Sequence, residues 1–122
     1  MVRRWSGGSR GLQTVGGRRK LKWAAQAARD FERAHAYWAE QSSKVGVRFA
    51  ATVLATIRAI KKAPDLGSPA LDLAPTGRYR GRLAGPLYRV IYRVDPEVIW
   101  IVRIWDTRRD PEGLVVDDLP GE

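Results

Sequence analysis

The sequence predicts an α+β fold in which an antiparallel two-helix hairpin packs on one face of a small antiparallel β-sheet. Three observations support this fold class. Residues 25–62 show two successive helical periods separated by a short break. Residues 78–105 show three successive strand periods separated by tight turns. A short alternating segment precedes the helices and adds an N-terminal strand to the prediction.

Length and composition indicate one folded domain with two flanking segments. The chain has 122 residues and a net charge of +9, and it contains no cysteine, which excludes disulfides and thiolate metal ligands. Residues 1–18 are rich in Gly and Arg, so we expect a disordered basic arm. The predicted domain spans residues 19–114, and residues 115–122 are predicted to form an acidic tail. No apolar run reaches the ~18 residues that span a membrane, so we expect a cytoplasmic protein.

The predicted elements begin with a short edge strand around Lys20–Ala24, where Leu21 and Trp23 alternate with lysines. From Ala25 the period becomes helical, and one apolar stripe forms the buried face of the first predicted helix: Ala27, Phe31, Ala34 and Trp38. Ser42 and Ser43 end that helix and supply an N-cap for the next. His35 lies on the same stripe, and a lone His there is typical of a half-buried structural residue rather than a base.

The second predicted helix runs from about Lys44 to Lys62, and Pro64 ends it. Its apolar stripe is Phe49, Val53, Ile57 and Ile60. Lys61 and Lys62 oppose the negative end of the helix dipole. The short break between the helices predicts a hairpin with one shared apolar face, and residues 65–76 are predicted to form a loop.

Three predicted strands follow: Arg78–Ala84, Tyr88–Val94 and Val98–Trp105, with turns at Gly85-Pro86 and at Asp95-Pro96-Glu97. In the middle strand, tyrosines and valines alternate with Arg89, Ile91 and Arg93. The helical hairpin is predicted to cover the Tyr/Val face. We therefore expect the opposite face to be exposed and to carry a cluster of arginines: Arg80, Arg82, Arg89 and Arg93. Guanidinium groups bind phosphate or carboxylate with two parallel hydrogen bonds, so this cluster predicts an anionic partner.

The order of these elements and the strings APDLGSP and YRVIYRVDPEVIWIVRIWDTRRDP resemble the RelE/ParE superfamily of bacterial type II toxins. The resemblance covers about Leu21 to Leu114. It implies a small toxin that is neutralised by a cognate acidic antitoxin protein. It also implies one of two activities: RelE-like members cut mRNA in the ribosomal A site, and ParE-like members poison DNA gyrase.

The resemblance places several arginines at working positions of a RelE-like enzyme. Arg80 and Arg82 match strand-borne residues that bind RNA, and Arg89 matches an arginine at the scissile phosphate. Arg108 or Arg109 matches a further phosphate-binding arginine. If the chain acts by binding instead, the predicted antitoxin- or target-binding surface is Arg80, Arg82, Arg89, Arg93, Arg103 and Trp105.

The sequence departs from RelE-like nucleases after the last strand, where those enzymes usually carry a Tyr or His. Here the segment reads Asp110-Pro-Glu-Gly-Leu114, and no Tyr, His, Lys or Cys follows Tyr92. Arginine is a poor general base because it does not deprotonate in proteins. A carboxylate such as Glu97, Asp106 or Glu112 is the remaining candidate for proton transfer.

These observations favour ParE-like poisoning of gyrase and keep two alternatives open. One is a ribosome-dependent mRNA endonuclease, and the other is a nucleic-acid-binding module without toxicity. We expect no cofactor and no small-molecule ligand, and we expect no metal site because the sequence has one His and no Cys. The residues Asp106, Arg108, Arg109 and Asp110 also fit a surface ion network that closes the strand end.

Overall fold

The structure is a computed structural model, and it describes residues 19–73 and 77–116. The predicted arm, residues 1–18, and residues 117–122 of the predicted acidic tail lie outside the described residues. Strand β1 (Lys20–Trp23) leads into helix α1 (Ala25–Gln41) and helix α2 (Ser43–Lys62). After a 3₁₀ turn at Pro64–Leu66, the remaining strands are β2 (Ser68–Pro69), β3 (Arg80–Ala84), β4 (Tyr88–Val94) and β5 (Val98–Asp106).

The described strands form one five-stranded sheet in the order β1-β5-β4-β3-β2. Strands β3, β4 and β5 form the predicted antiparallel meander, but β1 runs parallel to β5, so the sheet is mixed rather than antiparallel throughout. Part of the predicted loop is also a strand, because Ser68 and Pro69 pair with Gly81 and Arg80. A strand of two residues has no period that a sequence could reveal.

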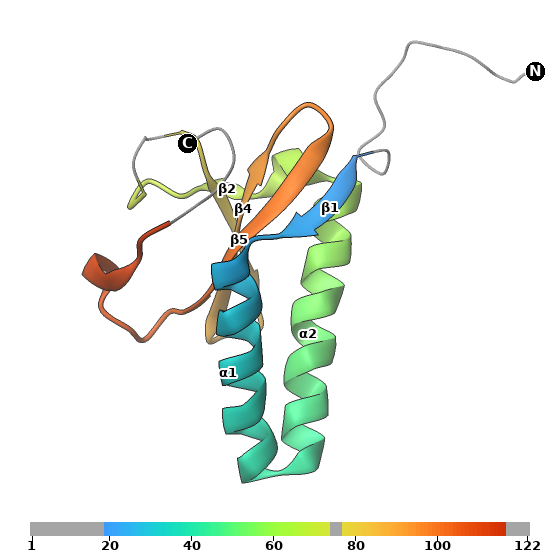
Figure 1. Ribbon diagram of the computed structural model, residues 1–122, viewed down its shortest axis with the longest axis vertical. Helices are drawn as coiled ribbons and strands as arrows, with labels where there is room; N and C mark the ends of the chain where they lie inside the picture. Colours follow the sequence, from blue (N-terminus) through green and yellow to red (C-terminus); the bar gives the residue numbers. More distant parts are fainter. Residues whose placement is uncertain (1–18, 74–76, 117–122) are drawn as a thin grey trace, which may run out of the picture.

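The two helices form an antiparallel hairpin that lies against one face of the sheet and extends well beyond it (Figure 1). Ser42 caps α2, because its Oγ accepts hydrogen bonds from the Lys44 and Val45 amides. A Cβ at Gly46 would lie 2.9 Å from Cα and Cβ of Ala39, so glycine allows α1 and α2 to approach closely here. Neither helix, within the described residues, has the length and hydrophobicity of a bilayer-spanning segment.

The main core lies between the helices and the sheet. The α2 stripe is buried as predicted, and it packs against the even-numbered residues of β4, including Tyr88, Val90 and Tyr92. The Tyr92 hydroxyl donates a hydrogen bond of 2.6 Å to the Pro64 carbonyl at the end of α2, and burial raises the pKa of this phenol. His35 is half-buried and stacks on Phe31, in agreement with the structural role predicted for it.

The opposite face of the sheet is also covered, and this differs from the prediction of an exposed face. A second cluster of buried residues joins Ile91 and Val102 of the sheet to loop residues and to Leu114 near the C-terminus. Trp105 belongs to this cluster and is 3% exposed, and the half-buried Trp100 packs against it. Residues 70–73, Tyr79 and residues 114–116, which lie outside the helices and strands, thus close the face that the helices leave open.

Candidate functional site

The predicted arginine cluster is divided between the two faces of the sheet, so the prediction of one shared exposed face is wrong. Arg80 pairs with Tyr92 and Arg82 with Val90 across β3 and β4, which places both arginines on the helix-covered face. Arg89 and Arg93 alternate with those residues and lie on the opposite face, which is covered by loops.

The length of the turn between β3 and β4 causes this division. Ala84 pairs with Tyr88, so three residues connect the strands, and the first of them, Gly85, has a positive φ of 67°. When a hairpin loop has an odd number of residues, the even-numbered residues of one strand lie opposite even-numbered residues of the other. A change of one residue in the connection would reverse this relation along the whole strand.

On the helix-covered face, Arg80 is held near the end of α2. Its Nη1 donates to the carbonyls of Gly67 at 2.9 Å and Asp65 at 3.4 Å. Arg82 is half-buried and makes no hydrogen bond or ion pair with the residues that the structure describes. Arg80 therefore acts as a tie between the sheet edge and the segment after α2.

On the loop-covered face, two arginines bind carboxylates of this same chain. Arg89 Nη2 lies 2.8 and 3.0 Å from the two carboxylate oxygens of Asp72, and its methylenes pass over Gly81. Arg93 is 2% exposed and binds Asp95 through two hydrogen bonds of 3.0 and 2.7 Å. The sequence predicted that these guanidinium groups would bind anions of another molecule. In the structure both bind carboxylates of this chain instead.

Arg103 is also buried, and its contacts join helix α1 to the C-terminal segment. Its guanidinium forms two hydrogen bonds with Asp30 of α1, at 2.7 and 3.0 Å, and its Nη1 donates to the Val115 carbonyl at 2.7 Å. The Asp30 carboxylate also accepts from the Ile104 amide at 3.0 Å, just beyond the part of β5 that β1 covers. Because β1 ends before it reaches Ile104, the Asp30 carboxylate supplies the hydrogen-bond acceptor that a longer β1 would have offered to the Ile104 amide.

Asp30 was not singled out from the sequence, although a signal was present. It follows Ala27 by three residues and precedes Ala34 by four, so it lies on the apolar stripe of α1. A carboxylate on a buried stripe requires a partner of opposite charge. That requirement points to an arginine on the sheet.

Arg108 and Arg109 follow β5 and have different environments. Arg108 forms a bidentate pair with Asp106 at 3.0 and 2.7 Å, and the hydrogen bonds from Arg108 hold the pKa of the Asp106 carboxyl below its usual value. This ion pair was one of the two interpretations of the cluster that the sequence allowed. The Arg109 guanidinium instead lies 4.5 Å from the centre of the Trp105 ring, within the range of a cation–π contact.

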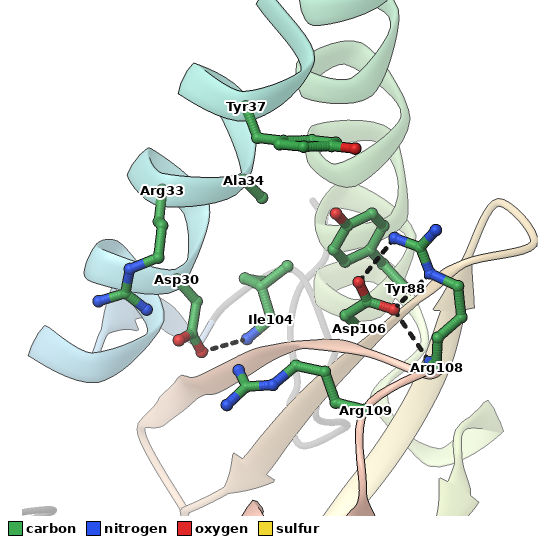
Figure 2. A pocket seen from close by; sticks show the side chains of 9 residues that line it. All are labelled: Asp30, Arg33, Ala34, Tyr37, Tyr88, Ile104, Asp106, Arg108 and Arg109. Carbon is green, nitrogen blue, oxygen red and sulfur yellow. Dashed lines mark hydrogen bonds and ion pairs between the residues drawn. The ribbon is translucent and has the colours of Figure 1, made fainter.

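These two arginines line a pocket of about 330 Å³ between α1 and the end of β5, here called the α1–β5 pocket (Figure 2). Its lining residues are Asp30, Arg33, Ala34, Tyr37, Tyr88, Ile104, Asp106, Arg108 and Arg109. The first four lie on α1, and the others come from β4, β5 and the turn after β5. The sequence predicted three of these residues as site candidates, Asp106, Arg108 and Arg109, and the fold adds the rest.

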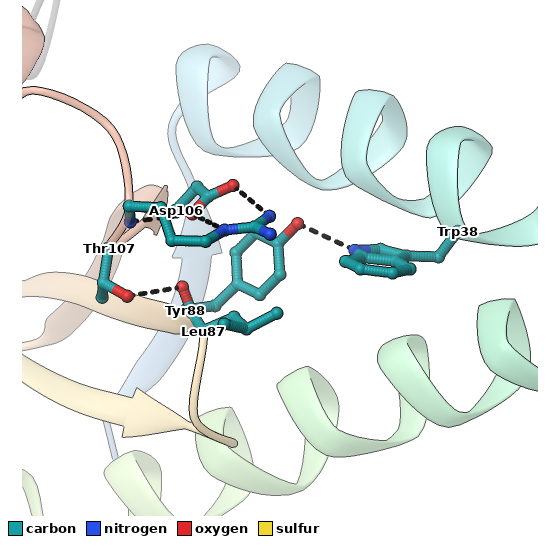
Figure 3. A network of polar contacts seen from close by, with 6 residues as sticks. Trp38, Leu87, Tyr88, Asp106 and Thr107 are labelled. Carbon is teal, nitrogen blue, oxygen red and sulfur yellow. Dashed lines mark hydrogen bonds and ion pairs between the residues drawn. The ribbon is translucent and has the colours of Figure 1, made fainter. Parts of the chain in front are cut away.

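Tyr88 is fixed at this pocket by contacts on both sides (Figure 3). Its hydroxyl accepts a hydrogen bond of 2.8 Å from Trp38 Nε1, and its ring packs edge-on against Phe49. The preceding Leu87 carbonyl accepts from the amide and the hydroxyl of Thr107. The pocket wall at Tyr88 is thus held by a helix and by the turn that follows β5.

The remaining proton-transfer candidates are not gathered at one place. Glu97 and Glu112 are exposed in separate turns, and Asp106 is bound to Arg108. Among the described residues, no group of three or more His, Cys, Asp or Glu side chains is arranged to hold a metal ion. Whether any predicted site residue contacts a target or an antitoxin stays a prediction.

Comparison with known proteins identifies relatives of this architecture. The model of a family described as ParE toxin of type II toxin-antitoxin system, parDE, matches residues 21–111. No curated protein sequence matches.

Three solved structures have a similar fold. A chain of the chromosomal ParDE system from P. aeruginosa has a TM-score of 0.61 at 16% identity, covering 74% of this chain and 97% of that one. A YoeB/ParE toxin from Agrobacterium tumefaciens has a TM-score of 0.52 at 22% identity, with coverages of 71% and 97%. YoeB from Staphylococcus aureus, solved as a dimer, has a TM-score of 0.52 at 24% identity, with coverages of 71% and 94%. At these identities the likeness concerns the fold.

Proposed function

The chain belongs to the ParE toxin family of type II toxin–antitoxin systems, and we propose that it arrests growth by binding and poisoning DNA gyrase. A cognate antitoxin neutralises it in this proposal. Gyrase acts in the cytoplasm, so the proposal includes a cytoplasmic location. The toxin family and the fold are established for this chain, and gyrase as the target of the toxin is what we propose.

The internal ion pairs of Arg89, Arg93 and Arg103 carry this proposal. RNA cleavage requires cations that are free to meet the charge developing on the phosphate. Arg93 and Arg103 are buried and bound to carboxylates, and Arg89 is bound to Asp72. Action by surface contact on a protein target makes no such demand, which favours gyrase binding over phosphate chemistry.

A supercoiling assay with purified gyrase tests the proposed target. We expect the full chain to inhibit supercoiling at micromolar concentration. In a parallel assay for trapped gyrase–DNA cleavage complexes, of the kind that quinolones produce, we expect it to leave cleaved DNA. The Arg89→Ala variant is expected to retain this inhibition, because Arg89 is bound to Asp72 rather than presented to a partner. Normal supercoiling activity at micromolar toxin would reject gyrase as the target.

A ribosome-dependent mRNA endonuclease is the second candidate, and one observation favours it. The side chains of Arg89 and Asp72 are 27% and 35% exposed, so their ion pair is accessible to a phosphate that could replace the Asp72 carboxylate. In this case expression should produce cuts within translated mRNA. Arg89→Ala should abolish the cuts, and Asp72→Ala should preserve or increase them because it releases Arg89. Intact mRNA in growth-arrested cells would exclude cleavage.

A further inference from the structure

Helix α2 carries positive charge on the side that faces away from its buried residues. The helix is uninterrupted over its whole length and contains five Lys or Arg residues and no Asp or Glu (Figure 1). Four of these cations form no ion pair with the residues that the structure describes. With two alanines they make one exposed stripe at spacings of three and four residues, here called the basic stripe: Lys44, Arg48, Ala51, Ala55, Arg58 and Lys62.

The charges of the basic stripe do not stabilise the helix that carries them. Lys44 and Arg48 are like charges four residues apart, as are Arg58 and Lys62, and such pairs destabilise a helix. Lys44 also lies at the positive end of the helix dipole, in a first turn that contains no acidic residue. A charge pattern that lowers the stability of its own helix indicates an anionic partner outside the domain.

The spacing of the charges matches the dimensions of duplex DNA. Arg48 and Arg58 are ten positions apart, which corresponds to about 15 Å along a helix that rises about 1.5 Å per residue. The major groove of B-DNA is about 12 Å wide and admits an α-helix. When α2 crosses this groove, the two arginines meet phosphates on its two sides, and the small side chains of Ala51 and Ala55 let the helix come close.

Two other polyanions match this surface less well. The major groove of A-form RNA is deep and narrow, so it does not accept the side chains of a helix in this way. A helix that binds a membrane surface inserts a face of large apolar side chains into the lipid. In α2 that face is already buried in the core of the protein, where it contains Phe49, Val53, Ile57 and Ile60.

We propose that the basic stripe of α2 is a docking surface for duplex DNA, with Arg48 and Arg58 bound to phosphates on either side of the major groove. Lys44 and Lys62 extend the contact at the two ends of the helix. The alanines between the arginines offer no hydrogen bond to base edges, so binding is independent of DNA sequence. This binding activity belongs to the toxin chain itself, and it goes beyond the poisoning of gyrase proposed above.

The test measures binding of the full chain to a short labelled DNA duplex by fluorescence anisotropy. The double variant Arg48→Gln/Arg58→Gln should bind at least ~10-fold more weakly at about 0.1 M salt, because two phosphate contacts are lost. For the same reason, the slope of the logarithm of affinity against the logarithm of salt concentration should become shallower by about 2. Duplexes of unrelated sequence should bind equally well. Circular dichroism confirms that each variant is folded.

The matched control removes the same charge from another part of the surface. Lys20 and Lys22 are exposed on β1 and alternate with Leu21 and Trp23, which pack against the main core, so the lysines lie on the loop-covered side. Lys20→Gln/Lys22→Gln should bind DNA within about 2-fold of the wild type, because salt screens charges that lie away from the contact.

Equal losses of affinity in the two double variants would overturn the inference, since binding would then follow net charge rather than the basic stripe. Absence of DNA binding by the wild type would also overturn it. So would tighter binding of the wild type to an RNA duplex, or to vesicles of phosphatidylcholine and phosphatidylserine, than to the DNA duplex. These measurements contain no gyrase, so a negative supercoiling assay would reject the proposed target and leave this inference standing.

Discussion

The two faces of the sheet are covered by different means. On one face, two long helices with regular apolar stripes bury a continuous core that includes Val53, Ile57 and Val90. On the other, irregular segments provide a smaller cluster around Ile91 and Val102. The first cover depends mainly on burial of apolar area, which is nondirectional. The second depends on particular polar contacts that hold segments without secondary structure in position.

Arginine side chains supply many of these polar contacts on the loop-covered face. On the loop-covered side, Arg89 holds the loop through Asp72, and Arg103 holds both α1 and the C-terminal segment. These guanidinium groups replace the regular hydrogen bonding that a helix or strand would supply. A basic composition in this protein therefore reflects internal ties as well as attraction to other molecules.

The largest expected effect follows removal of the tie between α1 and the sheet. Asp30→Ala should lower the free energy of unfolding by about 3–5 kcal/mol, because it leaves the Arg103 charge buried without its carboxylate. It also leaves the Ile104 amide without its acceptor. Urea unfolding of the full chain measures the change. Glu32→Ala, an exposed acid on the same helix, is the control and should change stability by less than about 0.5 kcal/mol.

A second substitution in the Asp30→Ala background separates charge from packing. Arg103→Met removes the buried cation and should recover part of the lost stability. Further loss of stability on adding Arg103→Met would show that the contact to Val115 matters more than the uncompensated charge.

The next-largest expected effect compares the packing on the two faces of the sheet. Ile57→Ala should cost about 2–5 kcal/mol, because a residue that is 2% exposed between a helix and the sheet leaves a cavity that rigid neighbours cannot fill. Leu114→Ala removes a similar side chain from the loop-covered cluster, where the irregular C-terminal segment can shift to close the space. We expect a smaller loss there in the same urea experiment. Equal losses would contradict the view that the two covers differ in rigidity.

The helix-covered face was predictable because its signals are periodic. Phe49, Val53, Ile57 and Ile60 repeat at helical spacing, and each is buried in the structure. The alternation along β4 was also predicted correctly, with Tyr88, Val90 and Tyr92 on one face and Arg89 and Arg93 on the other. Local periods determine which side chains of one element lie together.

The arrangement of the arginines was not predictable from those periods. Alternation within a strand does not say which of its faces joins which face of its neighbour, because that depends on the number of residues in the turn. The three-residue connection at Gly85 placed Arg80 with Tyr92 and not with Arg89. The α1–β5 pocket was not predicted either, because local periods do not bring distant residues together. Arg33 and Arg109, which both line it, are 76 positions apart in the sequence.

The smallest expected effect concerns Asp106, whose pair with Arg108 has the same chemistry as Asp30–Arg103 but lies near the surface. Hydrogen bonds from Arg108 hold the pKa of the Asp106 carboxyl below its unfolded value of about 3.9, so the pair stabilises the fold above that pH. The contribution is lost as pH falls through the lower, folded-state pKa. Asp106→Asn should therefore be slightly less stable than wild type at pH 7, and the two should converge in acid. Urea midpoints at pH 7 and near pH 2.5 measure this. A loss of stability in Asp106→Asn as large as that expected for Asp30→Ala would mean that burial does not determine how strongly these ion pairs stabilise the fold.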